Sequence, residues 1–355
     1  MPSLRTSTVP QQVAEYLRKE LVRGRWIDKM PGRDLLATEL GVSPRSVQVA
    51  LKILEMEGLL TPQGPGRPSR IAGSNHCAAP ALRVAVLTFD RASRGNDHQI
   101  ELRHQIEEAG HVPVYFDKGL QELGMSPSRV ARLVHRTKAD VWVVVAASRE
   151  VLEWFVERDI AVFALAGRRQ SLPIPGTGPN KVPIYAEAAR RLIALGHRRI
   201  SLLCFRNLRL PDPSRSSRAF LHELQAAGIA TGAFNLPDWE ESQDGFLRML
   251  DSLFAHTPPT ALILDEPFLF HAAYHYFASR RIQVPQDVSM ICTDPDPTFA
   301  WCKPSVAHFG WDYRPVVRRI IRWINNVARG KTDTSPRSTK AELVDGGTMG
   351  RAPGC

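Results

Sequence analysis

Four polar side chains between residues 45 and 52 have the chemistry that recognises double-stranded DNA. The guanidinium of Arg45 can donate two hydrogen bonds to guanine, and the amide of Gln48 can pair with adenine. The hydroxyl of Ser46 and the ammonium of Lys52 suit contacts with bases or phosphates. We expect Arg45 and Gln48 to read bases, while the other two side chains hold the duplex.

A helix is needed to present these side chains on one face. Ser43 is a good N-cap residue, and Pro44 fits the first helical position because that position needs no N–H. The apolar stripe facing inward from this helix comprises Val47, Ala50, Leu51 and Leu54. The preceding helix ends at Gly41, whose permissive backbone suits a tight turn between helices. Its inward residues are Leu36, Ala37 and Leu40.

A further helix upstream and a hairpin downstream complete a small domain. Thr8 and Gln11 form a capping box for the first helix. Its expected buried stripe comprises Val13, Tyr16, Leu17 and Leu21. Residues 59–61 and 69–71 predict two short strands around a Pro/Gly-rich tip at residues 64–67.

The predicted hairpin carries Arg67 and Arg70, and a basic hairpin of this kind reaches phosphate or the minor groove. The order of three helices and a hairpin predicts a winged helix-turn-helix that binds duplex DNA. The alternative interpretation is an ordinary three-helix bundle whose charged face is merely solvated.

This stretch resembles the DNA-binding domain of the GntR family of bacterial transcription regulators. The matching features are Gly24, Trp26, Pro31-Gly32, Leu36-Ala37, Leu40-Gly41-Val42-Ser43, Val47, Ala50-Leu51, Leu54, Glu57-Gly58-Leu59-Leu60 and Gly66-Arg67. The resemblance implies that operator DNA is contacted by Ser43, Arg45, Ser46, Gln48 and Arg67.

The chain departs from the GntR pattern at two places. The family commonly has Ser-Arg where this chain has Ser43-Pro44, and Glu-Arg where it has Arg33-Asp34. Each change removes an arginine that can contact phosphate. Either Arg33 and Arg45 take over these contacts, or the operator is unusual.

Composition agrees with a regulator of two or three domains. The chain has 355 residues and a net charge of +10, which favours polyanionic partners without implying sequence recognition. The N-terminus lacks the apolar region of a signal peptide, and no apolar run is long enough to span a membrane, so we expect a cytoplasmic protein. The five cysteines are scattered and odd in number, and we expect reduced thiols: Cys77, Cys204, Cys292, Cys302 and Cys355.

After residue 72 the sequence changes character. Residues 73–81 are small and polar, as in an interdomain linker. From residue 82, short apolar runs alternate with helical stripes, which predicts parallel sheets covered by helices on both faces. The expected strands are residues 82–87, 112–116, 141–145, 162–165, 200–204, 261–264 and 288–292.

About 260 residues exceed one comfortable core, so we predict two α/β lobes with a cleft between them. The first lobe is expected to hold residues 82–177 and 306–330, and the second residues 178–305 and 331–345. Residues 1–72 are then the DNA-binding domain, residues 82–345 the effector-binding and dimerisation domain, and residues 346–355 a tail.

In open α/β sheets, ligands bind at the carboxyl ends of the strands. The candidate pocket residues are therefore those that follow the expected strands: Phe89, Asp90, Arg91, residues 146–149 with Arg149, residues 167–168, Asp265, Glu266 and Asp294.

Residues 82–345 resemble the effector-binding domain of LacI-family repressors, which shares the fold of periplasmic sugar-binding proteins. The matching segments are Leu195-Gly196-His197-Arg198-Arg199-Ile200, Phe220 with Gly228-Ile229, Pro259-Thr260-Ala261-Leu262, Val284-Pro285-Gln286-Asp287-Val288-Ser289 and Pro304-Ser305-Val306. The resemblance implies that Asp294 contacts the effector and that Asp265-Glu266 replaces the family's Asn-Asp pair. The family's effector-binding arginine has three competing counterparts, Arg215, Ser216 and Arg218, of which we select Arg218.

A sugar is the expected effector. Carboxylates and arginines bind vicinal hydroxyls in pairs, and a flat ring can pack on the C–H face of a sugar. Phe89, Phe268 and Trp301 are candidates for that ring. The alternatives are structural: Asp294 favours a turn before Pro295, and Asp265 and Glu266 suit the first turn of a helix.

No enzyme motif emerges. His271 and His275 lie four residues apart, but they lack the intervening glutamate and a third metal ligand. No phosphate loop, nucleophile elbow or Schiff-base lysine is recognisable. We expect no metal, no cofactor and no catalysis.

These observations predict a transcription regulator, and we expect a repressor. A homodimer would bind a palindromic operator, because two recognition helices multiply the discrimination that one provides. A small molecule between the lobes would control that binding. The alternatives are a ligand-insensitive architectural DNA-binding protein and, less in keeping with the motifs, a small-molecule-modifying α/β enzyme.

Overall fold

The structure is a computed structural model that describes residues 8–22, 25–26, 29–64, 67–71, 80–91 and 95–354. It divides into two compact units, one of residues 1–81 and 328–330 and one of residues 82–327 and 331–355. Several features used in the sequence analysis lie outside the described residues, namely Gly24, the hairpin tip at 65–66, linker residues 73–79, Cys77 and Cys355.

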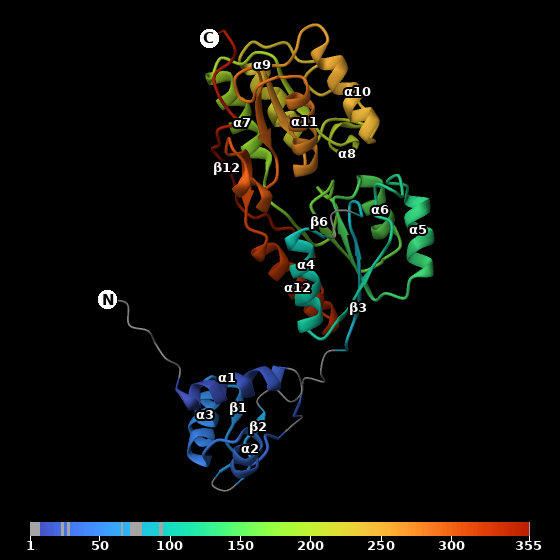
Figure 1. Cartoon of the computed structure of the whole chain (residues 1–355). Helices are drawn as coiled ribbons and strands as arrows, with labels where there is room; N and C mark the ends of the chain where they lie inside the picture. Colours follow the sequence, from blue (N-terminus) through green and yellow to red (C-terminus); the bar gives the residue numbers. More distant parts are fainter. Residues whose placement is uncertain are drawn as a thin grey trace, which may run out of the picture. The chain divides into compact units, whose positions relative to one another are not determined.

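The described residues of the N-terminal unit form three helices and a two-stranded antiparallel hairpin (Figure 1). As predicted, Ser43 caps the third helix, because its Oγ accepts a hydrogen bond from the N–H of Ser46 at 3.1 Å. The first helix begins with the predicted bond from the N–H of Thr8 to Gln11 Oε1, at 2.9 Å. The elements are α1 (Val9–Val22), α2 (Arg33–Leu40), α3 (Pro44–Met56), β1 (Leu60–Thr61) and β2 (Arg70–Ile71).

The core of this unit follows the predicted stripes with one correction. Leu17, Leu36, Val47 and Leu54 are fully buried. Tyr16, which we predicted to be buried, is 39% exposed. The buried stripe of α1 runs through residues 13, 14 and 17, so position 16 lies at its edge, where the Tyr16 hydroxyl accepts a hydrogen bond from Arg25.

The second unit has two lobes, each built on a five-stranded sheet. The sheet of the first lobe is entirely parallel, with strand order β4-β3-β5-β6-β7. Its elements are β3 (Arg83–Leu87), α4 (Asp97–Glu108), β4 (Val112–Tyr115), α5 (Pro127–Arg136), β5 (Val141–Val145), α6 (Arg149–Glu157), β6 (Val162–Leu165), β7 (Gly176–Thr177) and, later in the chain, α12 (Arg314–Ala328).

The second lobe has strand order β12-β11-β10-β9-β8, and only β12 is antiparallel to its neighbour. Its elements are α7 (Val182–Ala194), β8 (Ile200–Leu203), α8 (Arg206–Arg209), α9 (Arg215–Ala226), α10 (Gln243–Phe254), β9 (Ala261–Leu264), α11 (Pro267–Ser279), β10 (Ser289–Cys292), the 3-10 helix η2 (Pro297–Trp301), β11 (Ala307–Trp311) and β12 (Ala341–Val344).

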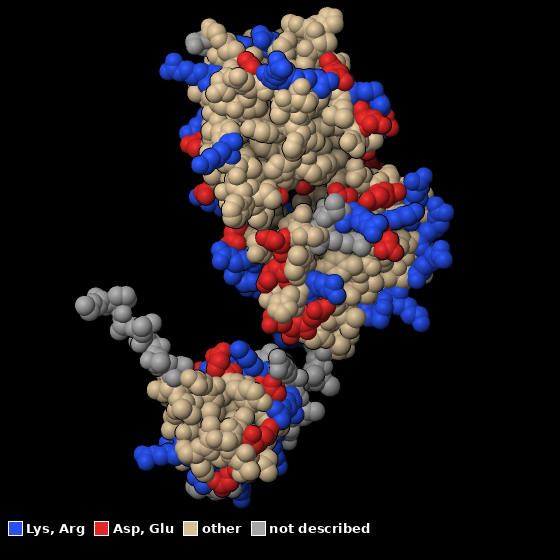
Figure 2. Space-filling view, viewed as in Figure 1, with Lys and Arg blue, Asp and Glu red and all other residues tan. Residues whose placement is uncertain are grey.

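Helices cover both faces of each sheet, which confirms the predicted two-lobed α/β architecture with parallel sheets. In the first lobe, α4 and α12 pack on one face and α5 and α6 on the other (Figure 1). In the second lobe, α10 and α11 share one face, and α7 and α9 share the other. Lys and Arg side chains gather along the edge of the first lobe at α5, so basic charge is not confined to the N-terminal unit (Figure 2).

Three predicted boundaries are wrong. Residues 331–345 were expected in the second lobe, but Pro336 pairs with Gly176 of β7, and Asp333 pairs with Arg319 of α12, both in the first lobe. Residues 306–311 were assigned to the first lobe, but β11 pairs with β10 in the second sheet, and the chain returns to the first lobe only at α12. Residues 346–352 do not form a tail, since the hydroxyl of Thr348 donates to the carbonyl of Met290 and the carbonyl of Gly350 binds His197. All three errors concern pairing between separate segments of the chain, which local periodicity does not encode.

None of the described helices has the combination of length and apolar sequence that crossing a membrane requires.

Candidate functional site

The outer face of α3 presents the predicted DNA-reading residues. Arg45, Gln48 and Lys52 are exposed, while the inward stripe of Val47, Ala50 and Leu54 anchors the helix. Among the described residues, neither Arg45 nor Lys52 has an ion-pair or hydrogen-bond partner. Their charges are therefore available to a polyanion without first breaking an internal contact.

Some of the other predicted DNA-contacting residues already have hydrogen-bond or ion-pair partners within the unit. The hydroxyls of Ser43 and Ser46 lie 2.9 Å apart in the α3 cap, and the guanidinium of Arg33 pairs with Asp34 at 3.1 Å on the surface. Arg67 and Arg70 are exposed on the hairpin, where Arg70 lies opposite Thr61. The structure thus places the eight predicted residues on α2, α3 and the hairpin of one unit: Arg33, Ser43, Arg45, Ser46, Gln48, Lys52, Arg67 and Arg70.

Three of the predicted effector residues meet at the carboxyl ends of β9 and β10. Asp265 and Glu266 follow β9, and Asp294 follows β10. Lys181 lies in the segment that crosses from β7 of the first lobe to α7 of the second, and its Nζ is 2.6 Å from Asp294 Oδ2. The hydroxyl of Thr293 lies 2.9 Å from Asp265 Oδ1 and 3.2 Å from Asp294 Oδ2. We call these five residues the strand-end cluster.

Burial and neighbouring charges shift the pKa values of three members of the strand-end cluster, Asp265, Glu266 and Lys181. Burial raises the pKa of Asp265 to about 6, with Lys181 opposing the shift and Asp294 adding to it. Burial also raises the pKa of Glu266 well above its usual value, reinforced by Asp294 and Asp265. For Lys181, burial disfavours the charge, but the attraction of Asp294 and Asp265 outweighs it and raises the pKa. The ammonium of Lys181 therefore stays charged and holds the cluster together.

Asp294 also connects the cluster to the crossings between the lobes. The indole N–H of Trp311, at the start of the second crossing, donates to Asp294 Oδ1 at 3.1 Å. The ring of His98, from α4 of the first lobe, lies 5.9 Å from that of Trp311. Burial lowers the pKa of His98, which favours the neutral imidazole. Both oxygens of Asp294 are thus engaged by residues outside its own strand.

The first lobe contributes Phe89 and Asp90 to the same region. Phe89 follows β3, and its ring packs edge-on against Phe205 of the second lobe with centroids 5.0 Å apart. Asp90 is buried, and its charge contributes to raising the pKa of Glu266. The structure therefore brings five of the eight predicted effector residues together: Phe89, Asp90, Asp265, Glu266 and Asp294.

The three predicted arginines have other partners or positions. Arg149 binds Glu153 at 2.7 Å and the carbonyl of Gln170, and Arg218 binds Asp212 at 2.9 Å. Arg91 is exposed. None of the three has a described contact with the strand-end cluster, and the guanidinium groups of Arg149 and Arg218 bind acceptors close to them in the sequence or the fold.

Arg168 joins the two lobes instead. It follows β6 of the first lobe, and its guanidinium donates to the backbone carbonyls of Asn207 and Asp212 in the second lobe, both at 2.6 Å. The amide of Asn207 in turn donates to the carbonyl of Ala146 at 3.2 Å. These bonds hold the lobes against each other on the side of α8.

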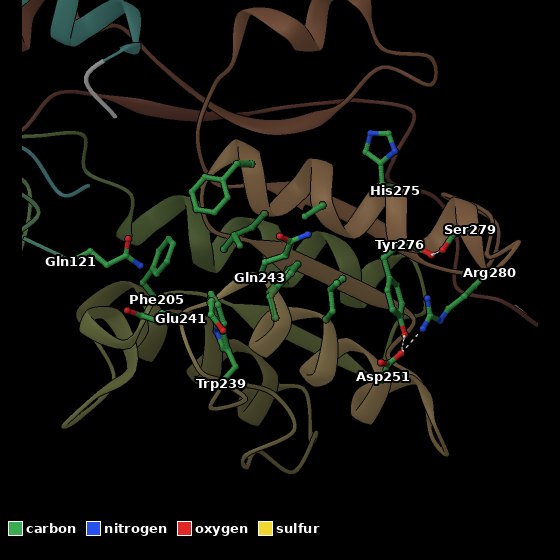
Figure 3. Close-up of a pocket in the computed structure, with 16 residues that line it drawn as sticks. Gln121, Phe205, Trp239, Glu241, Gln243, Asp251, His275, Tyr276, Ser279 and Arg280 are labelled. Carbon is green, nitrogen blue, oxygen red and sulfur yellow. Dashed lines mark hydrogen bonds and ion pairs between the residues drawn. The ribbon is translucent and has the colours of Figure 1, made fainter. Parts of the chain in front are cut away.

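A cavity of about 660 Å³ lies between α10 and α11 (Figure 3). Aromatic rings form much of its wall, including Phe205, Trp239 and the half-exposed Phe268. At the far end, Asp251 accepts hydrogen bonds from the Tyr276 hydroxyl at 2.8 Å and from Arg280 at 2.6 Å. Its volume falls within the range of small-molecule sites. The predicted ring candidate Phe268 lines it, whereas none of the eight predicted effector residues does.

Sequence reasoning missed Lys181, Thr293, Trp311 and the cavity. Trp311 satisfies the strand-end rule, but the run Ala307–Trp311 contains His308 and Gly310 and did not register as a strand. Lys181 lies in a crossing segment, where no periodicity operates. The cavity arises from the packing of two helices that are separated in the sequence.

The two histidines weighed as metal ligands point to different surroundings. The Nε2 of His271 lies 3.1 Å from the hydroxyl of Thr298, and His275 lines the cavity. Across the described part of the chain, no three His, Cys, Asp or Glu side chains are grouped in a way that could hold a metal ion.

Comparison with known proteins identifies the fold of the larger unit. A family model described as a periplasmic binding protein-like domain matches residues 189–349. No curated protein matches the sequence. Among solved structures, a complex of the transcriptional regulator CelR with cellobiose is 15% identical with a TM-score of 0.61, covering 90% of this chain and 100% of that chain.

Two further solved structures are similar to a smaller share of this chain. A LacI family transcriptional regulator from Enterococcus faecium with bound ribose is 14% identical with a TM-score of 0.60, covering 76% of this chain and 98% of that chain. The lac repressor dimer bound to operator and the anti-inducer ONPF is 15% identical with a TM-score of 0.60, covering 76% and 95%. At this identity the likeness establishes the two-lobed periplasmic-binding-protein fold.

Proposed function

We propose that this protein is a sequence-specific DNA-binding transcription regulator, acting as a repressor, whose operator binding is controlled by a small molecule. The observation that carries the proposal is the outer face of α3, where Arg45, Gln48 and Lys52 are exposed on a helix held by a capped N-terminus. Exposed donors with unpaired charges on a short helix suit the major groove of duplex DNA.

The N-terminal unit is proposed to be a winged helix-turn-helix of GntR type. The order of α1, α2, α3 and the β1–β2 hairpin supports it, as does the Gly41 turn, whose left-handed backbone (φ 64°) ends α2. Arg67 and Arg70 on the hairpin would contact phosphate or the minor groove. The solved neighbours named above are LacI-type regulators, so a GntR-type unit on this fold is the finer part of the proposal.

The larger unit is proposed to bind the effector, a carbohydrate. Two features support this site: carboxylates at the strand ends, which can accept hydrogen bonds from hydroxyls, and the aromatic wall of the cavity between α10 and α11, which suits the C–H face of a sugar. Similar folds bind cellobiose and ribose. We take Asp90, Asp265, Glu266 and Asp294 as the polar residues and Phe89 as an apolar wall, and we leave Arg91, Arg149 and Arg218 out of the site.

Control of DNA binding follows if the effector and the operator favour different arrangements of the lobes. Each ligand then changes the affinity of the other by the same factor. We propose a homodimer on a palindromic operator, because two half-sites together supply the discrimination that one short helix lacks.

The test uses the full chain. A thermal-shift screen of mono- and disaccharides should find a ligand that raises the melting temperature, because binding to the folded state stabilises it by mass action. The same ligand should change the affinity for an operator selected from randomised duplexes. If no carbohydrate shifts melting, the effector class is wrong; if a ligand binds without altering DNA affinity, the proposed control is wrong.

A ligand-insensitive architectural protein would behave differently. Its affinity would fall steeply with salt and would not depend on sequence, because phosphate contacts dominate such binding. Selection from randomised duplexes would then enrich no sequence.

A further inference from the structure

An apolar side chain, Val49, lies between the exposed cations of the outer face of α3. Val49 is 42% exposed, one helical turn beyond Arg45 and just before Lys52. At about 100° per residue, Arg45, Val49 and Lys52 fall within an arc of about 60° on the side opposite the buried stripe. Val49 therefore projects in the same direction as the two unpaired cations.

The fold gives no reason for a valine at this position. Val49 is absent from the hydrophobic cluster of the N-terminal unit, which takes its α3 members from Val47, Ala50, Leu51, Ile53 and Leu54. A β-branched residue on an exposed helix surface is less favourable for the helix than alanine. The side chain costs helix stability and does not join the hydrophobic cluster of its own unit.

The flanking charges indicate what covers it. Arg45 and Lys52 have no ion-pair partner among the residues that the structure describes, so a partner for this face should be strongly anionic. Double-stranded DNA supplies phosphates at the rims of the major groove and, on its floor, one exposed apolar group, the C5-methyl of thymine. The other groups on the floor of the major groove are polar, and they would give the methyl groups of Val49 no apolar contact.

We propose that Val49 is a specificity residue that packs against the C5-methyl group of a thymine in each operator half-site. The inference rests on the proposed function, because it requires α3 to enter the major groove. Arg45 and Gln48 would then read the hydrogen-bonding edges of bases. Val49 would distinguish thymine from cytosine by contacting the methyl group that only thymine carries.

The test replaces that methyl and nothing else. The operator selected by the full chain from randomised duplexes is resynthesised with each thymine changed in turn to deoxyuridine, which keeps the pairing edge and lacks the methyl. At one position per half-site, we expect the wild type to lose affinity about fourfold for each half-site, the effect of one buried methyl-sized group. The Val49→Ala variant should bind thymine and deoxyuridine duplexes equally.

Met56→Ala is the matched control, because Met56 is also apolar, 81% exposed and on the same face, but at the last residue of α3. It should keep the wild-type penalty for deoxyuridine. The inference would be overturned if the wild type bound every deoxyuridine duplex as tightly as the thymine operator. It would also be overturned if Val49→Ala kept the loss of affinity for deoxyuridine. If selection enriches no sequence, the proposed function itself fails, which separates the two outcomes.

Discussion

The outer face of α3 and the strand-end cluster handle charge in opposite ways. On α3, Arg45 and Lys52 are exposed and, among the described residues, unpaired. In the strand-end cluster, Lys181 and Asp294 form a 2.6 Å ion pair whose side chains are 21% and 14% exposed. The first arrangement leaves positive charge available to a partner. In the second, Lys181 and Asp294 neutralise each other within the fold.

The difference predicts where substitutions should act. Removing an exposed, unpaired charge changes binding and leaves folding largely intact. Removing one member of a mostly buried pair leaves its partner uncompensated, so it should reduce stability first. Substitutions in the two regions can therefore test whether the contrast holds.

The largest expected effect comes from Asp294→Ala. This change strands the ammonium of Lys181 and the indole N–H of Trp311, and we expect a loss of about 2–3 kcal/mol in the free energy of unfolding, reduced from the fully buried case by partial exposure. Urea unfolding followed by tryptophan fluorescence measures it, since six of the seven tryptophans lie beyond residue 82.

Lys181→Met and the double variant complete this test. Because both residues belong to one interaction, the double variant should lose less than the sum of the two single losses. Strictly additive losses would show that the pair contributes no coupling and would weaken the contrast between the two regions.

The next effect separates two kinds of DNA contact. Arg45→Ala should cost about 1–3 kcal/mol for the selected operator and little for unrelated duplexes, because a base contact is lost. Arg67→Ala should weaken all duplexes alike and reduce the salt dependence of binding, as expected for a phosphate contact. Equilibrium binding at several salt concentrations distinguishes them, and identical behaviour of the two variants would refute the assigned roles.

The strand-end cluster should also make stability depend on pH. Because the pKa of Asp265 is raised from 3.8 to about 6, the native state holds its proton more tightly than the unfolded chain does. The associated stability is present below about pH 4 and is lost as pH rises through 6, with a slope of up to about 1.4 kcal/mol per pH unit. Because Glu266 also has a raised pKa, urea unfolding of Asp265→Asn between pH 4 and 7 should show a shallower slope than that of the wild type; parallel curves would contradict the assignment.

The smallest effect concerns the α3 cap. Ser43→Ala removes the 3.1 Å bond to the N–H of Ser46 and should destabilise the N-terminal unit by about 1 kcal/mol. Faster amide hydrogen exchange in the first turn of α3 measures it, and Ser43→Asp, which can still cap, should restore protection. Unchanged exchange in Ser43→Ala would show that the cap is dispensable.

The sequence predicted the features that arise from neighbouring residues. The α3 cap, its apolar stripe and the hairpin depend on contacts within about 15 residues, and they were recognised from spacing and turn chemistry. The carboxylates at the strand ends were found through a general rule of parallel sheets.

The remaining features depend on residues far apart in the chain. Lys181 meets Asp294 across 113 positions, and Trp311 reaches it from a strand whose sequence is only partly apolar. The partner of an arginine at a strand end is also hard to predict from sequence, because its long side chain can bind a nearby acceptor, as Arg149 does with Glu153. Only tertiary packing decides these partners.

The most direct test of the central claim is a comparison of affinities for the selected operator and a scrambled duplex, measured by fluorescence anisotropy with the full chain at fixed salt. We expect the wild type to prefer the operator by about a thousandfold or more, and Arg45→Ala to lose much of this preference. Equal affinity of the wild type for both duplexes would contradict the claim that the outer face of α3 reads DNA sequence.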